Sequence, residues 1–299
     1  MPLRPGVHNV AATPFLPDQS LDEASLATLV AYCADRGCEG MLVLGVLGEA
    51  DKLSDAERDR AIAGFVEAAA GRLQITVGVT HPSTTVTRQR IRRAIDLGAD
   101  AVMVSPPPGT AAGPNLREHF RRVAESTGAD AIFVLQDHPT SSGVKLPVPF
   151  IVELADVLPR GSVVKLEDPP TAAKTAALLA ATKAYQVLGG LGGVALLHEL
   201  DAGSAGTMTG FALPEVLAEI VSSYRAGDRE TARNVFEAFL PLMVFEAQPG
   251  AGVALRKEIL RRRGAIAHAT VRQPAPTPDA FSLAALDRML AEADAIVAT

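Results

Sequence analysis

Tryptophan is absent from this chain, and aromatic residues of all kinds make up only 4% of its 299 residues. Because 48% of the residues are nevertheless apolar, the hydrophobic core has to be built mainly from Ala, Val, Leu and Ile. Alanine-rich helices packed on aliphatic strands fit this composition. The length is large for one small domain, but it suits an α/β barrel with a short extension.

Cysteine is also scarce, since Cys33 and Cys38 are the only two. Two cysteines are too few for a disulfide framework, and no second pair accompanies them to complete a zinc site. The N-terminal segment MPLRPGVHNV lacks the apolar core of a signal peptide, and no apolar run approaches the length of a membrane span. We therefore expect a cytoplasmic protein with reduced thiols and no membrane partner.

Positive charge is in slight deficit, with a formal net charge of -6 at pH 7. This balance provides no general attraction to nucleic acid or to an anionic membrane surface, so neither is expected as a partner. The one basic run, residues 256–263, lies on a helical pattern. We predict that it forms a solvated or intersubunit face.

Short apolar segments recur through the first part of the chain, and their starts are roughly 18 to 35 residues apart, which leaves room for a helix in each gap. Most are continuous apolar runs, as expected of parallel strands that are buried on both faces. The segments are 8–15, 40–45, 75–79, 101–106, 131–137, 163–168, 187–191 and 205–210.

The segments between these strands carry helix start signals. Ser20 with Glu23 and Ser54 with Glu57 both fit a capping box ahead of an apolar helical pattern. A doubly wound sheet would produce similar local signals, but eight strand-then-helix units in a row favour a (β/α)8 TIM barrel.

The strand pattern stops near Pro214, and helical patterns follow at 229–248, 253–264 and 282–298. We therefore predict two parts: a barrel over residues 1–227 and a C-terminal three-helix extension over residues 228–299.

The sixth strand ends in VVKLEDPP and carries Lys165, the only lysine near a predicted strand end that could point into the barrel. Active sites of such barrels lie where the strands end. Loss of hydration favours the neutral amine, which can attack a carbonyl and form a Schiff base. The alternative is a lysine that only pairs with Glu167 or Asp168. Four further lysines fall in expected loops or helices and are predicted to be ordinary surface charges: Lys145, Lys174, Lys183 and Lys257.

Several motifs occur in a recognisable order: GVHNVAATPFLPDQSLD, GVLGEADKLSDAER, GADAVMVSPPP, FVLQDHPTSSG, VVKLED and GSAGTMTGFALPE. From end to end the chain resembles the dihydrodipicolinate synthase / N-acetylneuraminate lyase superfamily. The resemblance implies a TIM barrel that uses no cofactor and binds a small 2-oxo acid. It also implies that Lys165 forms the Schiff base and that the protein is a homo-oligomer, a dimer or a tetramer.

The sequence departs from the family pattern where hydroxyl groups are expected. Val46 and Leu47 replace two hydroxyl residues of the loop after the second strand, although the backbone amides from Val46 to Gly48 could still hold a substrate carboxylate. Gln136 replaces the tyrosine that serves as general acid/base, and its amide can orient a substrate but cannot shuttle protons. Pro108 replaces a second tyrosine. The hydroxyl relay of the family is therefore absent as a set.

Three residues could take over the acid/base role: Asp137, His138 and Glu167. His138 could instead pack in a turn, and Glu167 could simply pair with Lys165, because strand alternation places both on one face. Near the Gly-rich eighth strand, Met208 is expected at the substrate pocket.

A metal site of the class II aldolase kind could also be assembled from His81, Asp137, His138 and Glu167, but nothing in their spacing requires it. We therefore expect no metal.

The predicted function is that of a Schiff-base lyase of the aldolase type, acting on pyruvate or a related small 2-oxo acid. The arginine that grips the second substrate in dihydrodipicolinate synthesis would fall near Ser141, so that activity is not expected. Two alternatives remain: a sugar-acid dehydratase of the same superfamily, or a catalytically inactive barrel that binds a metabolite.

Overall fold

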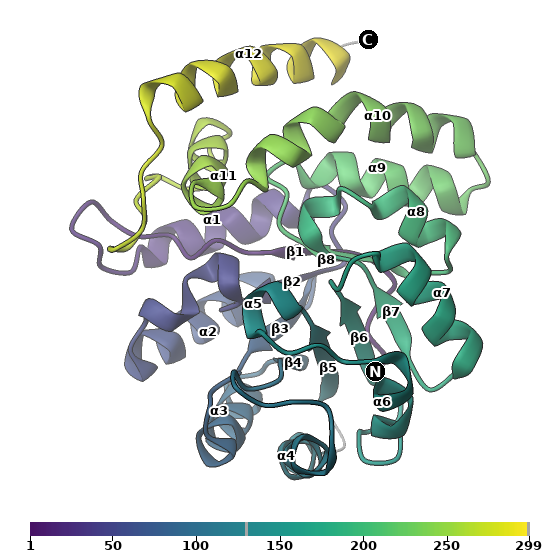
Figure 1. Ribbon diagram of the computed structural model, residues 1–299. Helices are drawn as coiled ribbons and strands as arrows, with labels where there is room; N and C mark the ends of the chain where they lie inside the picture. Colours follow the sequence, from purple (N-terminus) through teal and green to yellow (C-terminus); the bar gives the residue numbers. More distant parts are fainter. Residues whose placement is uncertain (129–130, 298–299) are drawn as a thin grey trace.

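The computed structural model describes residues 1–128 and 131–297, and its centre is a barrel of eight parallel strands (Figure 1). Hydrogen-bonded neighbours follow the order β7-β6-β5-β4-β3-β2-β1-β8. A bridge between Gly189 and Thr207 closes the seam between β7 and β8, where the Gly189 N–H donates to the Gly206 carbonyl at 3.0 Å. The predicted TIM barrel is confirmed. Its strands are β1 (Gly6–Val10), β2 (Gly40–Val43), β3 (Gln74–Gly78), β4 (Ala101–Val104), β5 (Ile132–Asp137), β6 (Val163–Leu166), β7 (Gln186–Leu188) and β8 (Gly206–Thr209).

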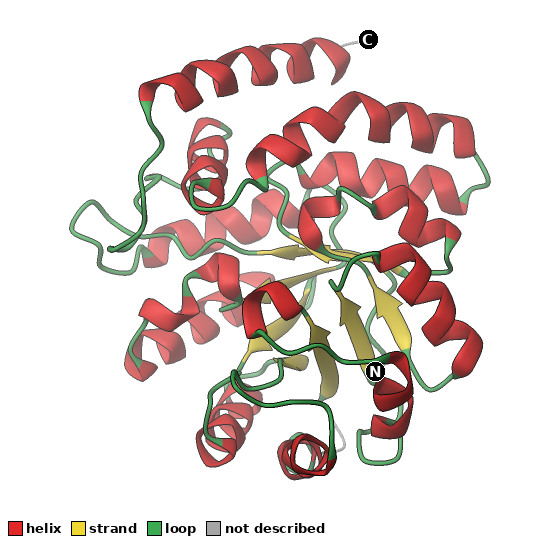
Figure 2. Cartoon of the chain, viewed as in Figure 1, coloured by secondary structure: helices red, strands yellow, loops and turns green. Residues whose placement is uncertain are grey.

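Helices surround the strands, as Figure 2 shows. The α-helices that alternate with the strands or follow β8 directly are α1 (Glu23–Ala34), α2 (Asp55–Ala69), α3 (Thr84–Asp96), α4 (Pro114–Ala124), α5 (Pro139–Ser142), α6 (Val148–Leu154), α7 (Thr171–Ala181), α8 (Leu196–Asp201) and α9 (Pro214–Arg225). Short 3₁₀ turns follow β2 and β7: η1 (Val46–Gly48), η2 (Ala50–Lys52) and η3 (Leu191–Gly193). The chain continues through α10 (Arg229–Glu246), α11 (Gly252–Arg262) and α12 (Ala280–Val297). Within residues 1–128 and 131–297, none of these helices has the length and apolar character needed to cross a bilayer.

One of the two predicted helix caps is confirmed. At the start of α2, the Glu57 N–H donates to Ser54 Oγ at 3.3 Å and the Ser54 N–H donates to Glu57 Oε2 at 2.9 Å, which is a complete capping box. The cap predicted at Ser20 is wrong. Asp22 caps α1 and accepts from the Ser25 N–H at 3.2 Å, because its carboxylate stands directly before the first helical residue.

The barrel interior is filled by side chains from alternate strand positions. Val134 and Val163 belong to this inner apolar layer. Two residues further along, Gln136 and Lys165 are paired in the ladder between β5 and β6. Because side chains alternate across a strand, these two polar residues also face inward, at the carboxyl end of the barrel.

A buried ion pair fastens α11 to the loop after β2. Lys257 Nζ lies 2.6 Å from Glu49 Oε1 and donates to the Thr270 carbonyl at 2.8 Å. Burial lowers the pKa of Lys257 to about 8, although the charge of Glu49 opposes this shift. The prediction that Lys257 is a surface charge is therefore wrong. The pair holds the adjacent residue, Arg256, beside the barrel mouth.

Candidate active site

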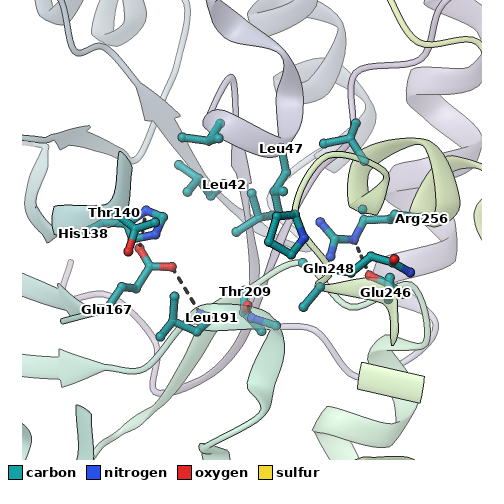
Figure 3. A pocket seen from close by; sticks show the side chains of 18 of the residues that line it. Leu42, Leu47, His138, Thr140, Glu167, Leu191, Thr209, Glu246, Gln248 and Arg256 are labelled. Atoms are coloured by element: carbon teal, nitrogen blue, oxygen red, sulfur yellow. Dashed lines mark hydrogen bonds and ion pairs between the residues drawn. The ribbon is translucent and has the colours of Figure 1, made fainter. Parts of the chain in front are cut away.

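A cavity of about 450 Å³ opens at the carboxyl ends of the strands (Figure 3). Lys165 from β6 and Gln136 from β5 line it, together with Glu167 and His138, which follow those strands. Leucine side chains from β2 and the loop after it supply apolar walls. The cavity is large enough for a small metabolite and combines apolar walls with a few polar groups.

Lys165 and Glu167 meet at one wall of this cavity. Lys165 Nζ lies 3.0 Å from Glu167 Oε2, and the two side chains are only 5% and 6% exposed. Gln136 Nε2 donates to the same carboxylate oxygen at 2.8 Å, and the Leu191 N–H donates to the other at 3.3 Å. The ion pair between Lys165 and Glu167 therefore exists. It places an amine next to a proton acceptor at a site that little water reaches.

Electrostatics keep Glu167 ionised. Burial alone would favour its neutral form, but the charges of Lys165 and His138 and the hydrogen bond from Gln136 together hold the pKa of Glu167 below its usual value. His138 Nδ1 lies 3.8 Å from Glu167 Oε2. Burial lowers the pKa of His138, with the charge of Glu167 opposing, so the neutral imidazole dominates at neutral pH.

A chain of hydrogen bonds orients Gln136. The Ser105 N–H donates to Thr80 Oγ1 at 2.9 Å, and Ser105 Oγ donates to Gln136 Oε1 at 2.6 Å. Because Gln136 Oε1 accepts this bond, its Nε2 is directed at Glu167. Gln136 thus positions the carboxylate.

The loop after β2 reaches the cavity through Val46 and Leu47, which both line it. Their amides lie at the start of η1, where an intrahelical acceptor cannot precede them. The Gly48 N–H donates to the Gly45 carbonyl at 3.0 Å, and the Gly48 carbonyl accepts from Thr13 Oγ1 at 2.6 Å. Of the three amides predicted to hold a carboxylate, that of Gly48 is therefore engaged within the loop.

Two predicted site residues lie elsewhere. Asp137 Oδ2 accepts from Lys174 Nζ at 2.6 Å, because alternation on β5 turns it away from Gln136 and toward α7. Lys174 also reaches Asp168 at 2.9 Å, so the prediction that it is an ordinary surface charge is wrong. Met208 packs in the apolar barrel interior, while its neighbour Thr209 lines the cavity.

The four residues of the metal alternative are not assembled at one point. His138 and Glu167 line the cavity described above, whereas His81 lines a second cavity beside Ser105 and Asp137 faces Lys174. In the part of the chain that the structure describes, no three His, Cys, Asp or Glu side chains gather as a metal site would need.

Sequence reasoning missed Arg256 and Glu246, which line the opposite side of the cavity. Arg256 Nε donates to Glu246 Oε1 across a buried contact between α11 and α10. The prediction that residues 256–263 form a solvated or intersubunit face is thus wrong at Arg256, although Arg261 on the same helix is 45% exposed. The signal was present, since residues 256, 259 and 260 share one helical face and the last two are a buried isoleucine and leucine.

Comparison with known proteins agrees with this architecture. The model of the dihydrodipicolinate synthetase family matches residues 4–293. The chain belongs to this family. Its members are lyases that include dehydratases and synthases, bind small 2-oxo acids and are usually oligomeric.

Individual relatives within the dihydrodipicolinate synthetase family have different reactions. L-2-keto-3-deoxyarabonate dehydratase from Azospirillum brasilense is 31% identical over 278 residues, which cover 92% of this chain and 90% of that protein. 4-Hydroxy-tetrahydrodipicolinate synthase from Kineococcus radiotolerans is 30% identical over 300 residues, covering 97% and 94%. The crystal structure of dihydrodipicolinate synthase from Rhodopseudomonas palustris superposes with a TM-score of 0.92 at 33% identity, covering 98% of this chain and 99% of that one.

Another buried carboxyl, that of Glu199 on α8, lies behind the cavity against Gly189. Burial raises its pKa to about 7 from 4.5, with Thr171 opposing the shift. In this pH interval the unfolded carboxyl is ionised while the folded one keeps its proton, so stability is expected to fall as pH rises toward 7.

Glu199→Gln should therefore flatten the pH dependence of stability. The wild-type protein should lose about 3 kcal/mol relative to the variant between pH 4.5 and 8, from the shift in the pKa of Glu199. Urea unfolding at several pH values measures this difference, with the exposed Glu237→Gln as the matched control. Parallel pH profiles for wild type and Glu199→Gln would contradict the expectation.

Proposed function

We propose that the protein is a Schiff-base dehydratase of a 2-oxo-3-deoxy sugar acid, with Lys165 as the nucleophile. The observation that carries the proposal is the contact of 3.0 Å between Lys165 Nζ and Glu167 Oε2 inside the cavity. The similarity to L-2-keto-3-deoxyarabonate dehydratase supports the substrate class. The cavity volume of about 450 Å³ supports it further, because pyruvate alone would fill only a small part of that space.

The first step joins the substrate to the enzyme. Glu167 accepts a proton from Lys165, and the neutral amine attacks the C2 carbonyl of the substrate. The C2 oxygen takes one proton from this nitrogen and one back from Glu167 and leaves as water. A protonated imine then joins Nζ and C2, and Glu167 is again ionised. The amides of Val46 and Leu47 are suited to hold the substrate carboxylate, since both residues line the cavity and their N–H groups begin η1.

The second step removes a proton from C3. This carbon is two bonds from the imine nitrogen, so a carboxylate in contact with Nζ is suited to reach it. Transfer of the proton to Glu167 gives an enamine, whose electrons then expel the hydroxyl group from C4. Glu167 can return the same proton to the departing hydroxyl, so one water leaves across C3 and C4. Hydrolysis of the unsaturated imine frees Lys165.

This scheme gives Glu167 the task that the missing tyrosine performs elsewhere in the family. Gln136 neither accepts nor donates a proton in this scheme. Its hydrogen bond to Glu167 at 2.8 Å aims the carboxylate instead. His138, whose Nδ1 lies 3.8 Å from the same oxygen, takes no part in the proton transfers of this scheme.

Borohydride trapping tests the imine directly. The protein incubated with pyruvate and then reduced should gain the mass of one reduced pyruvate adduct per chain, measured on the intact protein. No adduct with pyruvate or with a 2-oxo-3-deoxypentonate would overturn the proposal and leave a metabolite-binding barrel.

Product analysis with a 2-oxo-3-deoxypentonate separates dehydration from aldol cleavage. Dehydration gives one product that retains all carbon atoms, whereas cleavage gives pyruvate and an aldehyde. Detection of pyruvate would favour the aldolase type of lyase, which passes through the same imine.

We also propose that the protein works in the cytoplasm as a homo-oligomer, a dimer or a tetramer, with residues 228–299 as an extension that closes one side of the cavity. The family's usual oligomeric state supports the assembly. Light scattering on the purified chain measures its mass in solution.

A further inference from the structure

Arg256 lines the cavity and carries a hydrogen-bond donor, Nη1, that the protein leaves unused. Its Nη1 is buried and has no hydrogen-bond partner among the residues that the structure describes. The whole residue is only 4% exposed. A buried donor without an acceptor costs free energy, so its retention calls for an acceptor from outside the chain.

The guanidinium is held in place by groups that have no other role in the proposed reaction. Glu246 accepts from Arg256 Nε, and Glu246 Oε2 is itself fixed by the Ala212 N–H at 2.9 Å. A Cβ atom at Gly210 would lie 2.9 Å from Nη1, so glycine leaves the room that the guanidinium occupies at the end of β8. This is a prepared position and not a chance contact of a long surface side chain.

The position of Arg256 defines which end of a substrate it could meet. Figure 3 shows Arg256 across the cavity from Glu167, which contacts Lys165. The 2-oxo end of a substrate is attached to Lys165 in the proposed function. The substrate carboxylate is held by the amides of Val46 and Leu47 in the same scheme, so the group left to meet Arg256 is the far end of the carbon chain.

Resting on the proposed function, we infer that Arg256 binds the terminal hydroxyl oxygen of a 2-oxo-3-deoxy sugar acid and so selects substrates that are longer than pyruvate. The acceptor is a neutral oxygen because Glu246 already balances the charge of the guanidinium. A second carboxylate at the far end would bring another negative charge next to Glu246.

Arg256→Lys tests this role while keeping a positive charge beside Glu246. The KM for a hydroxyl-terminated 2-oxo-3-deoxypentonate should rise about 10- to 100-fold, as expected for losing one hydrogen bond to a charged donor. The concentration of pyruvate that gives half-maximal adduct should change several-fold less, because pyruvate has no far end. Arg261→Lys, the same change on the exposed face of α11, should alter neither value.

Two further comparisons make the result decisive. The double variant Arg256→Met/Glu246→Gln removes both charges and should show the same selective loss, with thermal melting used to confirm folding. Equal losses for pyruvate and the pentonate would overturn the inference, because they would show a structural role. Preference for an acid with carboxylates at both ends would overturn it in favour of a dianionic substrate. If the wild-type protein forms no pyruvate adduct, the proposed function fails first and the inference falls with it.

Discussion

Lys165→Ala is expected to abolish imine formation and to lower turnover of a 2-oxo-3-deoxy sugar acid by at least about 10⁴-fold. Without the amine, C2 remains an unactivated ketone, and C3 loses the electron-withdrawing imine that makes its proton removable. Borohydride trapping followed by intact-mass measurement should show no added mass, and product formation should fall to background.

Loss of the lysine also leaves Glu167 buried without its cation, which destabilises proteins by about 3–5 kcal/mol in comparable pairs. Lys165→Arg controls for this effect, because guanidinium keeps the charge but forms no stable imine. It should fold like the wild type and be equally inactive. Lys183→Ala removes an exposed lysine and should leave trapping unaffected. An adduct that survives Lys165→Ala would place the reactive amine elsewhere.

Glu167→Gln should separate imine formation from the proton transfer that follows it. The amide can still contact Lys165, but it cannot accept a proton from C3. Exchange of the C3 protons of pyruvate with deuterated water, followed by NMR, should slow by about 10²- to 10⁴-fold. Borohydride should still trap an adduct, although more slowly.

Glu199→Gln is the matched control for this measurement, because it makes the same change at a buried glutamate that lies behind the cavity. Exchange in that variant should stay at the wild-type rate. If Glu167→Gln also exchanged at the wild-type rate, His138 would become the stronger candidate for the base. The lowered pKa of Glu167 further predicts that exchange persists on the acid side of the usual glutamate range.

The positions of the strands could be predicted because parallel strands are buried on both faces and appear as apolar runs. The residues at which the strands end could not be predicted in this way. The first run was predicted to extend to residue 15, yet β1 ends at Val10. Phe15 is fully buried and pairs instead with Leu21 in an antiparallel bridge. An apolar run in the sequence indicates buried residues, but residues that follow the end of a strand can be buried as well. The run therefore extends past the last residue that is hydrogen-bonded in the sheet.

The exposure of charged residues also differs between the sequence-based expectation and the structure. Lys174 and Lys257 lie on helices and are predicted to be surface charges, but the side chain of Lys174 is only 12% exposed, that of Lys257 is fully buried, and each pairs with a carboxylate from a distant segment. Arg256 and Lys257 are the two buried cations of a basic run in which Arg261 is 45% exposed. Local sequence gives the face of a helix, whereas the partner that buries that face comes from elsewhere in the chain.

The sequence by itself determined the barrel, the place of Lys165 at the end of its sixth strand and the absence of the family's hydroxyl relay. These are properties of strand order, pleat and residue type, which a linear pattern carries. Only the tertiary structure decided that Gln136 of β5 donates to Glu167, which follows β6, and that Arg256 reaches the same cavity. Those contacts join residues from different strands and from α11, so they exist only once the barrel has closed and the Glu49–Lys257 pair has fixed that helix at its mouth.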